Sequence, residues 1–197
     1  MITRKSKYDL VAEQTRGMHG TLADVGARDR VLQKYLQPGE LQYLSSDVIP
    51  GHDFTWDIEK AIPAGDRSFS VVAALDVLEH IEQCHCALRE LLRITDQKLF
   101  VSLPNMSGLS FRLHFMRYGQ LSAKYDLLPV HQGDRHRWLV VYDQAVRFIH
   151  AAAPPSEWKI TQYDIVAGYA RFHALFARLP LPPKLRAWTM LFKIERN

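Results

Sequence analysis

Four aspartates stand where short apolar or extended segments end: Asp24, Asp47, Asp57 and Asp76. Such segments predict strands, and the carboxyl ends of parallel strands form the edge of an open α/β sheet where ligands bind. A carboxylate after the second strand can accept hydrogen bonds from both hydroxyls of a ribose. Each acid taken singly also fits a helix-capping role. Because all four acids follow successive predicted strands of one sheet, we expect them to line one binding site.

The first acid opens a tight turn, with the sequence Asp-Val-Gly-Ala-Arg-Asp-Arg over residues 24–30. A turn between a buried strand and a helix brings backbone N–H groups close to a bound cofactor. Arg28 and Arg30 follow Gly26 at positions where further glycines would permit positive φ and close approach of a ligand. An arginine at such a position is strained or points away from the site. We expect these two side chains to decide whether the turn holds a ligand.

The fourth acid begins the string Asp-Val-Leu-Glu-His at residues 76–80, directly after the apolar run 69–75. Glu79 and His80 fit the first turn of a helix, where the helix dipole favours Glu79. They also fit a catalytic role, with His80 as a general base. Asp76, Glu79 and His80 could together ligate a divalent metal, but one short cluster does not define a metal site, and we assign no metal ligand.

The two cysteines of the chain are Cys84 and Cys86. Helical positions two residues apart lie on different faces, so the pair is poorly placed to share a metal, and a disulfide between them is equally awkward. Two reduced thiols, one of them facing the core, fit a cytoplasmic protein.

The elements that must position these residues alternate along the chain. Strands are expected over residues 21–25, 41–47, 54–57, 69–75, 98–103, 158–169 and 187–195, and helices over 6–17, 29–36, 83–95, 142–152 and 170–179. Strand–helix–strand alternation predicts a parallel α/β sheet with right-handed crossovers. The gap between 47 and 54 is too short for a helical crossover.

Composition limits the class of protein. The 197 residues are 47% hydrophobic and 23% charged, which is typical of a single globular domain over residues 1–197. No apolar run reaches the roughly 18 residues that a membrane span needs, and no apolar h-region follows the basic N-terminus. The net charge of +4 permits an anionic partner without requiring one.

Residues 105–138 mix aromatic with basic side chains and show no long single period. This pattern predicts an insertion or lid over the acceptor side of the sheet and favours that role over a nucleic-acid surface. It contains His131 and His136, which join His80 as candidate general bases.

The basic tail near the C-terminus contains Arg178, Lys184 and Arg186. These residues fit a linker that closes the sheet, with peripheral membrane contact as the alternative.

In this order the residues resemble class I S-adenosylmethionine-dependent methyltransferases, over roughly residues 18–105. The string at 76–80 is similar to bacterial enzymes of the ubiquinone- and menaquinone-methylating type. The resemblance implies a Rossmann-like, mostly parallel seven-stranded sheet with helices on both faces and an antiparallel last strand. It also implies S-adenosylmethionine as cofactor and a small-molecule methyl acceptor, with a lipid- or sugar-linked metabolite favoured.

The expected cofactor contacts follow the strand ends. Asp47 suits the ribose, Asp57 and Ile58 suit the adenine, and Asp24 with the backbone near Gly26 and Leu75 suits the amino-acid moiety. The full set is Asp24, Gly26, Ala27, Arg28, Asp47, Val48, Asp57, Ile58, Leu75, Asp76 and Val77.

Two alternatives remain open. The missing glycines suit a non-catalytic member that keeps the fold as a scaffold or binding protein. A nicotinamide dehydrogenase would need glycines at the positions of Arg28 and Val31, and neither is present.

Overall fold

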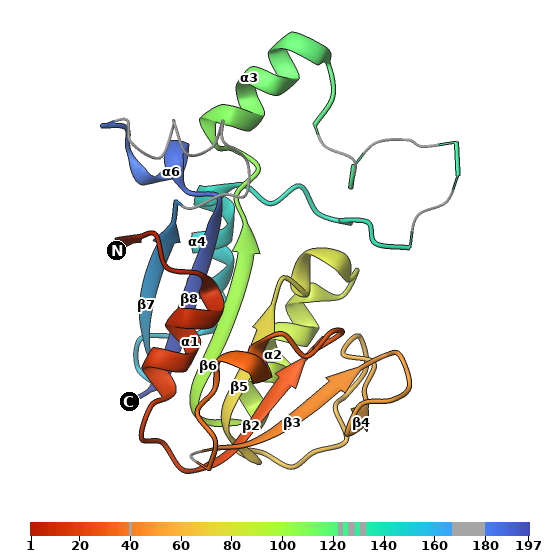
Figure 1. The fold of residues 1–197 in the computed structure, drawn as a ribbon, viewed down its shortest axis with the longest axis vertical. Coiled ribbons are helices and arrows are strands. Elements are labelled where there is room, and N and C mark those ends of the chain that lie inside the picture. The colour runs from red at the N-terminus through yellow and green to blue at the C-terminus, as the bar shows by residue number, and fades with distance from the viewer. Residues whose placement is uncertain (40, 122–123, 126–128, 131–132, 167–179) are drawn as a thin grey trace.

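The computed structural model describes residues 1–39, 41–121, 124–125, 129–130, 133–166 and 180–197. In this part of the chain, eight strands form one sheet in the order β1-β7-β8-β6-β5-β2-β3-β4 (Figure 1). The strands are β1 (Ile2–Thr3), β2 (Gly20–Val25), β3 (Leu41–Asp47), β4 (Phe54–Thr55), β5 (Phe69–Leu75), β6 (Thr95–Pro104), β7 (Trp158–Ile165) and β8 (Thr189–Arg196).

The sheet is mostly parallel. β2 pairs in parallel with β3 and β5, β3 with β4, β5 with β6, and β1 with β7. β8 lies antiparallel between β6 and β7. This is the Rossmann-like α/β fold predicted from the sequence, with its antiparallel last strand. The two-residue β1 adds an eighth strand to the seven expected.

Helices cover both faces of the sheet, and the alternation of side chains along β5 shows how. Val71 and Ala73 pack with Leu10 and Val11 of α1 (Lys7–Thr15) on one face. Val72 and Ala74 point to the opposite face, which is covered by α2 (Cys84–Ile94) and α4 (Tyr142–Ala152). Both faces of β5 are therefore buried, as its continuous apolar sequence predicts.

The helix predicted over residues 29–36 is wrong in extent. Only one 3₁₀ turn, η1 (Leu32–Tyr35), forms there. Arg28 and Arg30 both have positive φ, of 41° and 51°, so the right-handed helix cannot begin before them. Pro38 follows closely and limits the other end.

The described part of segment 105–138 contains a regular element that the sequence did not predict, α3 (Leu109–Tyr118), which has no buried residue. Figure 1 shows α3 beyond the carboxyl end of β6, beside the short helix α6 (Pro183–Arg186). The helix expected over 170–179 lies outside the described residues. None of the described helices is both long enough and apolar enough to cross a bilayer.

Candidate functional site

The sheet order places the four strand-terminal acids in one row. β5, β2, β3 and β4 are adjacent, and Asp76, Asp24, Asp47 and Asp57 lie at or just beyond their carboxyl ends. Residues far apart in sequence therefore meet at one edge of the sheet. This is the edge at which open α/β sheets bind their ligands.

The turn after β2 is built around Gly26, whose φ is 71°. The N–H groups of Gly26 and Ala27 both donate to the carbonyl oxygen of Ser46, at 2.9 and 3.0 Å. A Cβ atom on Gly26 would lie 2.6 Å from Cγ2 of Val77, in the turn after β5. The glycine is needed both for its backbone conformation and for close contact between the two turns.

Arg28 and Arg30 keep the left-handed backbone of glycines while their side chains extend elsewhere. The Arg28 N–H donates to Oδ2 of Asp47 at 3.1 Å, and its guanidinium lies 3.4 Å from Asp134 and is 64% exposed. The Arg30 guanidinium donates to the carbonyl oxygen of Gly51. Both alternatives foreseen for these arginines occur together: the backbone is strained and the side chains leave the turn.

Asp24 is a buried acid with a neutral partner. It is 4% exposed and accepts a hydrogen bond from the Tyr43 hydroxyl at 2.7 Å. Burial raises the pKa of Asp24 to about 6, although the Tyr43 hydrogen bond opposes this shift. The carboxyl thus gains a proton in mildly acidic solution.

The pKa of Asp76 shifts in the opposite direction. Its Oδ1 accepts from the Ser102 hydroxyl at 2.6 Å, and its Oδ2 pairs with the ammonium of Lys7, at the start of α1. Burial alone would raise the pKa of Asp76, but the Lys7 charge and the hydrogen bonds from Lys7 and Ser102 lower it overall. Sequence reasoning missed Lys7, because no local motif connects residue 7 to residue 76.

The remaining predicted cofactor contacts differ in exposure. Val48 is 61% exposed, Ile58 is buried in the core, and Asp57 pairs with Lys60 at 2.9 Å. Leu75 and Val77 are half-buried beside Asp76. Their contacts with a cofactor stay predictions.

Glu79 and His80 do not lie in the first turn of the following helix. They belong to a separate 3₁₀ turn, η2 (Leu78–His80), and α2 begins four residues later at Cys84. The predicted dipole interaction with α2 is therefore wrong. Glu79 is 1% exposed, its Oε2 has no hydrogen-bond partner among the described residues, and burial raises the pKa of its carboxyl to about 8.

Two of the three candidate bases meet at η2. The ring centroids of His80 and His136 lie 4.6 Å apart, and the two rings are perpendicular to one another. Burial lowers the pKa of His80, and it lowers the pKa of His136 to about 4, so both imidazoles are neutral at pH 7. The third candidate, His131, lies outside the described residues.

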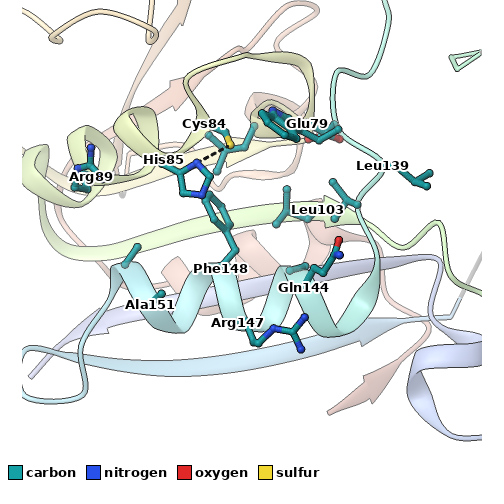
Figure 2. Close-up of a pocket in the computed structure, with 15 residues that line it drawn as sticks. Glu79, Cys84, His85, Arg89, Leu103, Leu139, Gln144, Arg147, Phe148 and Ala151 are labelled. Carbon is teal, nitrogen blue, oxygen red and sulfur yellow. Dashed lines mark hydrogen bonds between the residues drawn. The ribbon is translucent and has the colours of Figure 1, made fainter.

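A cavity of about 640 Å³ opens beside this cluster, between α2 and α4. Figure 2 shows Phe148 of α4 pointing toward His85 of α2, with Glu79 and Leu103 beside them and Ala151 further along α4. Its lining is mostly apolar, with Arg89 and Arg147 among the charged members. Sequence reasoning missed this cavity, because its lining comes from segments that are separate in the chain.

Of the two cysteines, Cys84 is buried beside this cavity and Cys86 is exposed, and neither forms a disulfide.

Comparisons with known proteins identify the fold. No family profile and no curated protein matches the sequence. Among solved structures, a proposed methyltransferase from Bacillus halodurans matches with a TM-score of 0.58 and 12% identity, over 97% of this chain and 99% of its own. The magnesium protoporphyrin IX methyltransferase of Synechocystis, solved with bound S-adenosylhomocysteine, matches with a TM-score of 0.57 and 14% identity, over 96% and 80%.

The same fold also carries other chemistry. The [4+2]-cyclase SpnF matches with a TM-score of 0.61 and 17% identity, over 95% of this chain and 78% of its own. The two methyltransferase matches show that the chain has the fold of class I S-adenosylmethionine-dependent methyltransferases. At these identities the similarity establishes the fold alone, and the activity has to be argued from the site.

Proposed function

We propose that this chain is an S-adenosylmethionine-dependent methyltransferase acting on a small molecule. The observation that carries the proposal is the row of acids at the carboxyl ends of β5, β2, β3 and β4. Ribose, adenine and amino-acid groups present hydroxyls and amines, and a row of carboxylates supplies acceptors for them. Glycine-like conformations at Arg28 and Arg30 support the proposal, because the turn keeps its shape without the glycines.

Lys7 and Asp76 suit the methionine end of the cofactor. An α-amino acid carries one ammonium and one carboxylate, and the pair Asp76–Lys7 offers the complementary charges at the carboxyl end of β5. We assign Asp76 to the ammonium and Lys7 to the carboxylate. Asp47 keeps its proposed role at the ribose, and Asp57 with Ile58 its proposed role at the adenine.

The methyl group of S-adenosylmethionine is already activated, so the protein mainly positions the acceptor and excludes water. We place the acceptor at the cavity between α2 and α4, which reaches Glu79 in η2, beyond β5, and Leu103 at the carboxyl end of β6. Its apolar lining supports a lipid-linked acceptor over a free sugar or a nucleic acid. The similarity of residues 76–80 to ubiquinone- and menaquinone-type enzymes agrees with this choice. We treat residues 1–197 as one domain, with 105–138 as the lid.

Two further proposals concern location. The free cysteines fit the reducing cytoplasm. Peripheral membrane contact through Lys184 and Arg186 of α6 would bring a lipid-linked acceptor to the lid; Arg178 lies outside the described residues.

Titration calorimetry with S-adenosylhomocysteine tests the proposed function. We expect micromolar binding, weakened about tenfold or more by Asp47→Asn, since about 1.4 kcal/mol of hydrogen bonding corresponds to a factor of ten. Asp66→Asn is the matched control, because Asp66 precedes β5 and lies away from its carboxyl end. Mass spectrometry of denatured protein would reveal co-purified S-adenosylhomocysteine.

Absence of heat at high protein concentration would contradict the enzyme and favour the second candidate, a non-catalytic scaffold. The observation that favours the scaffold is the Arg28–Asp134 ion pair, which joins the turn after β2 to segment 105–138.

A further inference from the structure

One side-chain cluster beside the proposed cofactor site is unexplained by methyl transfer alone. Glu79, His80 and His136 each offer a ligand atom, and these three atoms lie within 4.8 Å of one another. Glu79 and His80 belong to the turn η2, and His136 lies more than fifty residues later, in the segment 133–140 that precedes α4. We propose that Glu79, His80 and His136 form a binding site for one divalent transition-metal ion.

The hydrogen bonds of His136 determine which ring nitrogen is free. Nδ1 of His136 lies 2.9 Å from the Tyr125 hydroxyl, and that hydroxyl donates its proton to the carbonyl oxygen of Trp138 at 2.8 Å. The hydroxyl must therefore accept from His136, so Nδ1 carries the proton. In the neutral ring the lone pair is then on Nε2, the form in which imidazole ligates a metal.

His80 is held in the same tautomer. Its Nδ1 lies 2.9 Å from the carbonyl oxygen of Arg135, which can only accept, and 3.4 Å from Oδ1 of Asp134. Nδ1 thus donates, and Nε2 keeps its lone pair. Metal-bound histidines in proteins are commonly oriented in this way, by a carbonyl or carboxylate on the other ring nitrogen.

Glu79 supplies an independent indication of a ligand. Its side chain is 1% exposed, and within the described part of the chain its Oε2 is buried without a hydrogen-bond partner. A buried carboxyl oxygen without a hydrogen-bond partner is costly, and buried polar atoms are usually hydrogen-bonded or bound to a metal. A cation between Glu79 and the two imidazoles would satisfy that oxygen.

The backbone fixes the third ligand against the other two. The Arg137 N–H donates to the carbonyl oxygen of Glu79 at 2.8 Å, and the Trp138 indole donates to the carbonyl oxygen of Ile81 at 2.8 Å. These two bonds attach the chain just after His136 to η2 and to the residue that follows it. A cation nearby, Lys124, lies 3.2 Å from Asp134, so its charge is paired.

The donor set indicates the class of ion. Two imidazole nitrogens and one carboxylate oxygen suit Zn²⁺, Fe²⁺ or Co²⁺ and not Ca²⁺ or Mg²⁺, which prefer oxygen. Metal–nitrogen bonds of about 2.1 Å place donors roughly 3.3 Å apart, so the side chains close slightly on binding. Three protein ligands leave a position open for water or for an acceptor oxygen. The binding of an acceptor oxygen at this position is the one part of the inference that rests on the proposed function.

Metal binding is tested on the whole chain after treatment with a chelator, without cofactor. Titration with Co²⁺ should give one equivalent bound, with visible d–d absorption and no thiolate charge-transfer band, and Zn²⁺ should displace it. Glu79→Gln and His136→Ala should each weaken binding about 100-fold or more, and Tyr125→Phe about 10- to 100-fold, as for partners that orient a ligand.

The double variant His85→Gln/Cys86→Ser is the matched control, because the neighbouring Cys84-His85-Cys86 triplet carries side chains of metal-ligating type that are not part of the proposed site. It should bind Co²⁺ like the unaltered chain. Absence of binding, retained binding in Glu79→Gln, or loss in the control would each overturn the proposal. Circular dichroism of each metal-free variant verifies folding, and His136→Ala, at a partly exposed position, keeps the test valid if Glu79→Gln does not fold. S-adenosylhomocysteine binding, measured separately, distinguishes failure of this site from failure of the proposed function.

Discussion

Asp24 and Asp76 lie at the carboxyl ends of two paired strands, β2 and β5, yet their pKa values shift in opposite directions. Asp24 meets the neutral hydroxyl of Tyr43, so burial dominates and raises its pKa to about 6. Burial would raise the pKa of Asp76, but the Lys7 charge and the hydrogen bonds from Lys7 and Ser102 together lower it. Partners from distant parts of the chain, here the Lys7 ammonium and the Ser102 hydroxyl, therefore determine in which direction the pKa of such an acid shifts.

The two turns that follow these strands also differ in how they hold strained residues. Arg28, with φ of 41°, has an exposed side chain and a surface ion pair. Asp76, with φ of 57°, is bound by Lys7 and Ser102. The strained residue of the turn after β2 thus has an exposed ion pair, and that of the turn after β5 has a partly buried one.

The largest effect is expected for Asp24→Asn. Between the unfolded pKa of 3.8 and the folded value of about 6, the unfolded chain releases a proton that the folded chain keeps. Stability is therefore lost as pH rises through this window, by about 3 kcal/mol for a shift of roughly two units. The amide that replaces the carboxyl cannot titrate, so the variant should lose less stability from pH 4 to 7 in urea titrations. Equal pH profiles for both chains would contradict the raised pKa.

Lys7→Met should destabilise the chain by about 2 kcal/mol, because it leaves Asp76 charged without its cation. Loss of one partner of a fully buried pair costs about 3–5 kcal/mol, and Asp76 is 40% exposed, which reduces the effect. Lys5→Met is the matched control: the Lys5–Glu13 pair is exposed, and its loss should cost under about 0.5 kcal/mol. Thermal unfolding at pH 7 measures both, and similar losses would mean that the Lys7–Asp76 pair holds the turn after β5 no more strongly than an exposed ion pair would.

The smallest effect is expected at Arg28. Arg28→Gly should stabilise the chain by about 0.5 kcal/mol, since release of about 1 kcal/mol of left-handed strain exceeds the loss of an exposed ion pair. Arg28→Ala loses the same ion pair and keeps the strain, so it should not stabilise. Chemical denaturation compares the two variants, and equal stabilities would show that the backbone at Arg28 is unstrained.

Much of the fold could be predicted from local sequence. The apolar run of β5 predicts a strand buried on both faces, and Ala87, Leu88, Leu91 and Leu92 predict the buried side of α2. The helix expected over residues 29–36 failed because local pattern does not report that Arg28 and Arg30 adopt positive φ. α3 was missed because its exposed apolar residues give no clear amphipathic period.

The sequence by itself determined the alternation of strands and helices and the order of the acids after them, because both depend on residue type and short spacing. Only the tertiary structure decided the charge states and the clusters. Lys7 reaches Asp76 across 69 positions, and His136 reaches His80 across 56. Electrostatic and ligand interactions act through space over a few ångströms, so separation along the chain does not reveal them.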